Sequence, residues 1–192
     1  MKKFAFLLMI FSCFYLQTTY AQVEVVSSDE YGRIFDLTYD VNVENRVYAL
    51  AMTNHILQSD DNGETWNVLY WHPGKIVGLK LMPNNNALTF WSEKSIWADY
   101  GVFIFDLDSQ TIVKEFNLPS QYANREWITS YSIWEQDTDV ALVLQNYKIG
   151  LATYAKAQYT TNGGNDWTEV YYTEDNMNIS PNKVAINPAD SQ

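Results

Sequence analysis

Cysteine and histidine are scarce in this chain of 192 residues, and their scarcity excludes several kinds of chemistry. The single cysteine, Cys13, cannot form an intramolecular disulfide, so packing must hold the fold together. The two histidines, His55 and His72, have no second histidine at ligand spacing, and neither H-E-x-x-H nor C-x-x-C occurs. We therefore expect no metal, no cofactor and no zinc- or cysteine-based catalysis.

Basic residues are also few. The chain has 12 Lys and Arg against 23 Asp and Glu, a net charge of −11. A surface this acidic is repelled by nucleic acid and by anionic membranes, and no glycine-rich phosphate loop is present. No apolar run is long enough to span a bilayer, and no long helical period occurs after the first 20 residues. We expect neither a nucleic-acid partner nor a membrane span.

The N-terminal residues have the pattern of an export signal. Lys2 and Lys3 precede an apolar run, and Thr19-Tyr20-Ala21 offers a cleavage site before Gln22. A signal peptide over 1–21 would leave a mature chain, 22–192, with 10 basic and 23 acidic residues and a net charge of −13. The alternative is acylation of Cys13 as a lipoprotein. Both routes predict a secreted, cell-surface or periplasmic protein.

A short segment occurs twice, with corresponding residues 101 positions apart. Its glycines can take the positive φ that a tight reversal between two strands requires. Its hydroxyl and carboxyl groups can bond to turn backbone that no strand ladder satisfies. The matching positions are Ser59, Asp61, Gly63, Thr65 and Trp66 in the first copy and Thr160, Asn162, Gly164, Asp166 and Trp167 in the second.

The first copy resembles the Asp-box, or BNR repeat, of sialidase-like and sortilin-type β-propellers. The resemblance implies a structural turn between the third and fourth strands of a propeller blade, not a catalytic site. A calcium loop is the weaker alternative, because the spaced carboxylate series that ends in glutamate is missing.

Strand patterns and turns recur at blade-like spacing, which predicts an all-β chain of three four-stranded antiparallel blades plus the first strand of a fourth. We place the blades at about 30–72, 73–120 and 125–174, with the next beginning in 180–192. The expected strands are 33–39, 46–52, 55–59, 65–70, 75–82, 87–92, 101–106, 111–116, 127–134, 139–146, 154–160, 167–172 and 183–187.

Propeller rings have four to eight blades, so this count predicts an open fragment whose remaining blades belong to a longer chain. We expect blade three and the beginning of the fourth to expose apolar surface that a further blade would cover. Closure of the ring by oligomerisation is the alternative.

Sialidase activity, which the resemblance invites, requires three converging arginines in that family. The chain contains Arg33, Arg46 and Arg125, and Arg33-Ile34-Phe35 lacks the proline of the family's R-I-P segment. Arg46 falls at the Asp-box end of its blade, so no triad can be assembled from this chain.

A glycoside hydrolase of another kind would need paired carboxylates, one to protonate the leaving oxygen and one to activate water or attack. Asp99 and Glu126 are the weak candidates, because both lie at the blade end opposite the Asp-boxes. The alternative for each is a solvated loop carboxylate.

Ligands of Asp-box propellers bind at the face opposite the boxes, where long loops are expected at 93–100, 117–126 and 147–153. Aromatic rings there suit a sugar or an apolar partner, and an arginine suits a carboxylate. Packing of these rings onto their own blades is the alternative. We interpret the chain as a binding or scaffold module for a glycan or protein ligand, with a glycoside hydrolase as the alternative. The candidate ligand-binding residues are Trp97, Tyr100, Tyr122, Arg125 and Tyr147.

Overall fold

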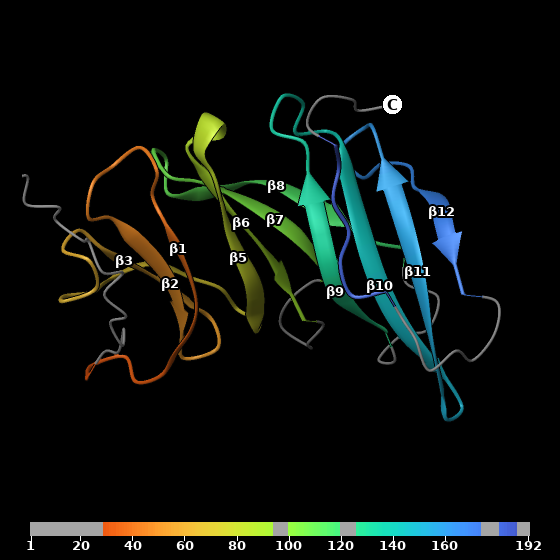
Figure 1. The fold of residues 1–192 in the computed structure, drawn as a ribbon, viewed down its shortest axis with the longest axis horizontal. Helices are drawn as coiled ribbons and strands as arrows, with labels where there is room; N and C mark the ends of the chain where they lie inside the picture. Colours follow the sequence, from red (N-terminus) through yellow and green to blue (C-terminus); the bar gives the residue numbers. More distant parts are fainter. Residues whose placement is uncertain (1–28, 94–99, 120–125, 174–180, 188–192) are drawn as a thin grey trace, which may run out of the picture.

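The computed structural model describes residues 29–93, 100–119, 126–173 and 181–187. These residues form an all-β fold of three antiparallel four-stranded sheets, in which each strand pairs with its sequence neighbour. The sheets lie in succession like the blades of an open propeller (Figure 1). A single turn of 3₁₀ helix, η1, covers Pro83–Asn85.

The twelve expected strands of the three blades are confirmed, with ends that shift by at most a few residues. Blade one contains β1 (Ile34–Tyr39), β2 (Val47–Ala51), β3 (His55–Ser59) and β4 (Asn67–Trp71); blade two contains β5 (Ile76–Met82), β6 (Ala87–Ser92), β7 (Gly101–Asp106) and β8 (Thr111–Asn117); blade three contains β9 (Glu126–Ile133), β10 (Ala141–Ile149), β11 (Ala152–Thr160) and β12 (Thr168–Tyr172).

Strand alternation sends apolar side chains to both faces of the central strands, so each blade packs on its neighbours. Tyr48 and Leu50 of β2 meet Leu88 and Phe90 of β6 in the core between blades one and two. A second core lies between blades two and three, where Phe116 of β8 is fully buried. Burial of one such side chain stabilises the fold by about 1.5–3 kcal/mol.

The first strands of successive blades are joined by side chains and not by a backbone ladder. Leu79 of β5 donates its backbone N–H to the Asp36 carboxylate of β1 at 2.9 Å. In the same way, the backbone N–H groups of Val184 and Ile186 donate to the hydroxyls of Ser130 and Ser132 of β9, both at 3.2 Å.

The predicted strand over 183–187 is therefore wrong as a ladder strand. The segment 181–187 carries no strand assignment, although Val184 packs against the core of blade three. The physical reason is that the first strand of a blade forms its ladder with the second strand of its own blade, and the described residues include no such partner for 183–187.

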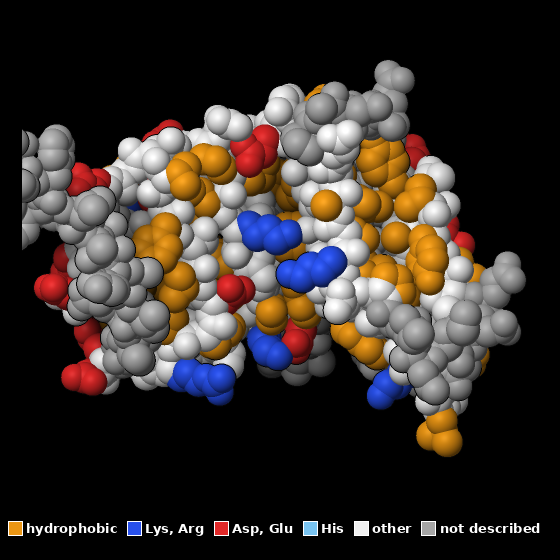
Figure 2. Space-filling model, in the orientation of Figure 1, with side chains coloured by type: hydrophobic (Ala, Val, Ile, Leu, Met, Phe, Trp, Pro, Cys, Tyr) orange, Lys and Arg blue, Asp and Glu red, His pale blue; other side chains and the backbone are white. Residues whose placement is uncertain are grey.

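Apolar side chains reach the surface on the two outermost blades. Figure 2 shows them over β1 at one end of the molecule and over β10 and β11 at the other. This exposure agrees with the expectation for blade three. The exposed large apolar residues of the edge strands β1 and β12 include Phe35, Leu37 and Tyr39 of β1 and Val170, Tyr171 and Tyr172 of β12.

The proposed signal peptide, 1–21, and the alternative acylation site at Cys13 lie outside the described residues. Among the residues that are described, no helix is long and apolar enough to cross a bilayer.

Candidate ligand-binding site

The two repeated segments form hairpin turns at the same end of their blades, and we call them the box turns. In blade one the Ser59 hydroxyl accepts the backbone N–H groups of Asp61 (3.2 Å) and Gly63 (2.8 Å) and donates to the Asp61 carboxylate (2.7 Å). The same carboxylate accepts the backbone N–H of Thr65 at 2.8 Å and its hydroxyl at 2.5 Å. These hydrogen bonds lower the pKa of Asp61 to about 2, and those from Thr65 have the largest effect.

The second turn repeats this pattern. The Thr160 hydroxyl accepts the backbone N–H groups of Asn162 (3.3 Å) and Gly164 (3.0 Å) and donates to the Asn162 side-chain oxygen (3.0 Å). That oxygen accepts the backbone N–H of Asp166 at 3.0 Å, and the Asn162 amide donates to the Asp166 carboxylate at 2.9 Å. Since the polar groups of each turn are engaged inside it, both segments are hairpin elements.

Antiparallel connectivity separates the two faces of the propeller. The box turns join β3 to β4 and β11 to β12, so the β2–β3 turn and the β4–β5 connection of blade one lie at the opposite end. Figure 1 shows this in blade three, where β9 and β11 run in one direction and β12 runs in the other. We call the face opposite the boxes the loop face.

Four of the predicted site residues, Trp97, Asp99, Tyr122 and Arg125, lie outside the described residues. Tyr100 is described and is 8% exposed. Its hydroxyl accepts a hydrogen bond from the Gln145 side chain at 3.2 Å, and burial raises its pKa.

Tyr147 lies on a strand and not in the expected loop 147–153. β10 continues to Ile149 and β11 begins at Ala152, because Gly150, with a φ of 62°, allows a tight turn. Tyr147 is 1% exposed and stacks on Tyr154, with ring centroids 5.5 Å apart. The Tyr147 ring therefore packs within its own blade, which is the alternative for these aromatics, whereas the Tyr100 hydroxyl is bonded to the neighbouring blade three.

Glu126 begins β9 and is paired with a lysine inside the protein. Its carboxylate lies 3.3 Å from the Lys156 Nζ, and both side chains are 3% exposed. The Lys156 Nζ also lies 5.7 Å from the centroid of the Tyr147 ring. The solvated-carboxylate alternative is thus wrong for Glu126, whose side chain is buried beside Lys156 among the described residues.

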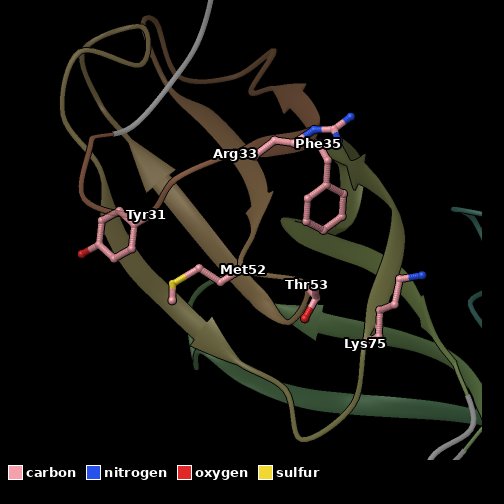
Figure 3. Close-up of a pocket in the computed structure, with 6 residues that line it drawn as sticks. All are labelled: Tyr31, Arg33, Phe35, Met52, Thr53 and Lys75. Atoms are coloured by element: carbon pink, nitrogen blue, oxygen red, sulfur yellow. The ribbon is translucent and has the colours of Figure 1, made fainter.

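The loop face carries a pocket of about 380 Å³ that sequence reasoning did not identify. It lies at the boundary between blades one and two. In Figure 3 the Phe35 ring points toward the β2–β3 turn, and the Met52 side chain extends toward Tyr31, while Lys75 lies at the other end of the pocket. The six lining residues are Tyr31, Arg33, Phe35, Met52, Thr53 and Lys75.

The floor of the pocket is a strained turn. Met52 and Thr53 have φ angles of 52° and 70°, a region that residues with a Cβ rarely adopt and that a β-branched residue resists most. Two backbone bonds of 2.9 Å hold the turn in place: Ile76 N–H donates to the Thr53 carbonyl, and His72 N–H donates to the Asn54 carbonyl. Such strain is typical of binding sites whose surroundings fix their geometry.

The His72 ring is buried beneath this connection. It contacts Phe103 and Phe90 with centroids 5.0 and 5.5 Å away, and desolvation lowers its pKa. A neutral ring in an aromatic cluster has a packing role. Among the described residues, no three His, Cys, Asp or Glu side chains gather as a metal-binding group.

A second pocket, of about 270 Å³, lies at the face of the box turns beside Trp134 and Ile186. Two of its polar side chains bind each other, because the Asn84 amide donates to the Glu135 carboxylate at 2.6 Å. The loop-face pocket, which combines two aromatic rings with two cationic side chains, is therefore the better candidate for a ligand.

A comparison with solved structures finds enzymes with a similar fold. The GH74 enzyme of Niastella koreensis superposes with a TM-score of 0.57 and 16% identity, over 90% of this chain and 29% of that one. The GH74 xyloglucanase from Xanthomonas campestris superposes with a TM-score of 0.53 and 14% identity, over 73% of this chain and 22% of that one. No family model and no curated protein matches the sequence.

At this level of identity the superpositions establish the fold alone. The three blades are part of a β-propeller-type architecture, and this chain spans less than a third of the length of either enzyme.

Proposed function

We propose that this chain is part of an exported propeller that binds glycans at its loop-face pocket. The observation that carries the proposal is the lining of that pocket, in which two aromatic rings and a methionine stand beside two cationic side chains and a turn held by two backbone bonds. Sugar rings present apolar C–H faces that stack on aromatic side chains, and their hydroxyls bond to polar groups at the rim. The carbohydrate-active neighbours support the same class of ligand.

A glycoside hydrolase is the second candidate function, and the similarity to GH74 enzymes favours it. Glycoside hydrolysis requires two carboxyl groups on either side of the scissile bond. The six residues that line the pocket include no aspartate or glutamate, and Glu126 is paired with Lys156. We therefore favour binding over catalysis for the described part of this chain.

Calorimetric titration with a panel of neutral and acidic oligosaccharides tests the proposal. We expect Phe35→Ala to weaken binding about tenfold, since it removes the ring that points toward the β2–β3 turn. The matched control is Tyr39→Ala, which removes an exposed ring from the same strand outside the pocket and should leave affinity unchanged.

Failure of the wild-type chain to bind any member of the panel would contradict the proposal. Release of reducing ends from a polysaccharide by the purified chain would instead establish the hydrolase. In both experiments, circular dichroism of each variant verifies that the blades are folded.

A further inference from the structure

We infer that Asn54 is the positioning residue of the loop-face pocket, which it shapes by tying the strained turn at the pocket floor to the β4–β5 connection. The inference rests on the proposed function and adds a residue that lies outside the lining of the pocket. It begins from Met52 and Thr53, whose φ angles of 52° and 70° are unfavourable, most of all for the β-branched threonine. A turn of this kind keeps its shape only where other bonds hold it.

Asn54 supplies such bonds with both its backbone and its side chain. Its backbone carbonyl accepts the His72 N–H at 2.9 Å, and its side-chain amide donates to the His72 carbonyl at 3.0 Å. The Asn54 side-chain oxygen lies 2.8 Å from the Nδ1 of His55, which orients the amide. One residue of the turn therefore holds both backbone polar groups of one residue of the connection, and we call this pair of bonds the Asn54 clasp.

The far side of the clasp is anchored in the core between blades one and two. His72 is 4% exposed, and its ring meets Phe90 and Phe103 edge-on. A ring packed among aromatic side chains cannot shift without loss of those contacts. The clasp therefore holds the turn against a packed support.

The clasp also holds two sides of the pocket together. Thr53 directly precedes Asn54, and Lys75 directly precedes Ile76, whose N–H donates to the Thr53 carbonyl at 2.9 Å. Figure 3 shows Thr53 and Lys75 on the two segments that these bonds join. Loss of the clasp would allow the strained turn to relax away from Lys75, and the pocket would lose its shape.

The buried histidine makes the clasp sensitive to acid. The His72 Nε2 has no hydrogen-bond partner among the described residues, and burial lowers the pKa of the ring. A proton on His72 is accommodated when the ring leaves the core for water, and this movement breaks the clasp. Since the pKa is lowered in the closed state, the clasp is fully favoured above about pH 6.5 and weakens as the pH falls below that value.

Other titratable side chains lie on the elements around the ring. They are the Tyr70 phenol of β4, 3.3 Å from the His72 Nδ1, Glu115 of β8, His55 of β3, the Lys75–Glu93 pair at the loop side and Asp106 at the far end of β7. None of them contributes to the shift in the pKa of His72, so burial decides its direction.

The test begins with amide hydrogen exchange of the full chain, read at Ile76 and corrected for the intrinsic rate at each pH. Asn54→Ala should reduce the protection of the Ile76 amide about tenfold at about pH 7.5, because the turn that accepts this amide loses its support. The matched control is Asn42→Ala, which removes an amide bond of 3.0 Å to the Pro83 carbonyl at the opposite face and should leave Ile76 unchanged. The amide of Gly63, in the first box turn, should stay protected in both variants and so verifies folding.

Calorimetric titration connects the clasp to the pocket. With the neutral oligosaccharides of the panel, cellotetraose among them, Asn54→Ala should weaken binding about tenfold and Asn42→Ala should leave it unchanged. Loss of Ile76 protection with unchanged sugar affinity would overturn the inference, since the clasp would then stabilise the turn without shaping the pocket. If the wild-type chain binds no sugar, the proposed function fails, whereas the exchange data still decide whether Asn54 holds the turn.

A pH profile separates positioning through His72 from a general loss of stability, and it requires no substitution at Asn54. In the wild-type chain the protection of Ile76 should fall at least about fivefold between about pH 7.5 and about pH 5, while Gly63 stays protected. His72→Phe keeps an aromatic ring in the core, cannot be protonated and should show no such fall. Unchanged protection of Ile76 in Asn54→Ala, or an acid response that persists in His72→Phe, would overturn the inference.

Discussion

The two box turns share their bonds to the turn backbone, but in the side-chain bond that closes each turn the donor and acceptor positions are exchanged. In blade one the Thr65 hydroxyl donates to the Asp61 carboxylate, whereas in blade three the Asn162 amide donates to the Asp166 carboxylate. The donor follows the glycine in the first turn and precedes it in the second. The turn therefore requires a donor opposite an acceptor, and a change at one position is compatible with the fold when its partner changes too.

The tryptophans after the two turns differ as well. Trp167 of blade three donates its indole N–H to the Asn117 carbonyl of blade two at 3.0 Å, and its ring meets Phe116 edge-on, with centroids 6.4 Å apart. Trp66 of blade one is 7% exposed, and its indole N–H has no hydrogen-bond partner among the described residues. The tryptophan of the motif thus joins two blades at Trp167, whereas at Trp66 it packs within blade one.

The largest expected effect comes from the hydroxyl that opens each turn. Ser59→Ala should lower the free energy of unfolding by about 2–4 kcal/mol, because Ser59 is buried and two backbone N–H groups lose their acceptor. Thr160→Val should have a similar effect in blade three. Urea denaturation measures both losses.

The control is Ser109→Ala in the exposed turn of blade two, which should cost less than about 0.5 kcal/mol. A loss confined to one of the two boxes would contradict their equivalence.

The second-largest expected effect tests the side-chain bond in which the donor and acceptor positions are exchanged between the two turns. Asn162→Asp should destabilise the chain by about 1–3 kcal/mol at neutral pH, because it places a second carboxylate against Asp166. Asp61→Asn should cost less than about 1 kcal/mol, since the Thr65 hydroxyl can accept a bond from the new amide.

The double variant Asn162→Asp/Asp166→Thr rebuilds the chemistry of the first box and should recover most of the loss. If the double variant is no more stable than Asn162→Asp in thermal and urea unfolding, the exchange is not what closes the turn.

A smaller effect separates the two tryptophans. Trp167→Phe should cost about 1 kcal/mol more than Trp66→Phe, because only Trp167 gives up a hydrogen bond between blades. Both substitutions remove an indole N–H from a hairpin of the same kind, and only in Trp167 does that N–H have a partner among the described residues. Equal losses in parallel denaturation curves would show that the bond to Asn117 contributes nothing measurable.

The smallest effect is a difference in acid response. The pKa of Asp61 is lowered to about 2 from 3.8, so its bonds stabilise the first turn fully above about pH 4 and are lost as pH falls through about 2. The position is occupied by Asn162 in the second turn, and this amide does not titrate. A carbon-detected NMR titration of the Asp61 carboxyl should give a midpoint near pH 2, and a midpoint near 4 would remove the basis of this contrast.

Much of the fold could be predicted from local sequence. Runs such as Arg46-Val47-Tyr48-Ala49, bounded by polar turns, located the strands to within a few residues, because β-branched and aromatic enrichment is a local property. The predicted loop over 147–153 is wrong, although the two strands beside it are confirmed, since Tyr147 and Lys148 extend a strand through cross-strand pairing with Tyr154 and Thr153. That pairing depends on a partner strand and leaves a weak local signal.

The candidate site was harder to predict. Phe35 and Met52 are ordinary strand and turn residues in the sequence, and nothing local indicates that they border one pocket. The positive φ of Thr53 leaves no compositional mark, because glycine or asparagine would be the expected residue there. Arg33 was visible only as two letters of an incomplete R-I-P segment, and its lack of a partner appears only when all its neighbours are in place.

The amino-acid sequence by itself determined the repeated hairpins and the order of the strands, since both follow from side chains that interact over a few residues. Only the tertiary structure decided which groups face solvent and which meet across blades. It paired Glu126 with Lys156 inside the protein and left Arg33 open at the loop face. The physical reason is that burial and pairing between blades are set by contacts over 30 to 50 positions, such as Lys156 to Glu126 and Trp167 to Asn117, and no local pattern encodes those contacts.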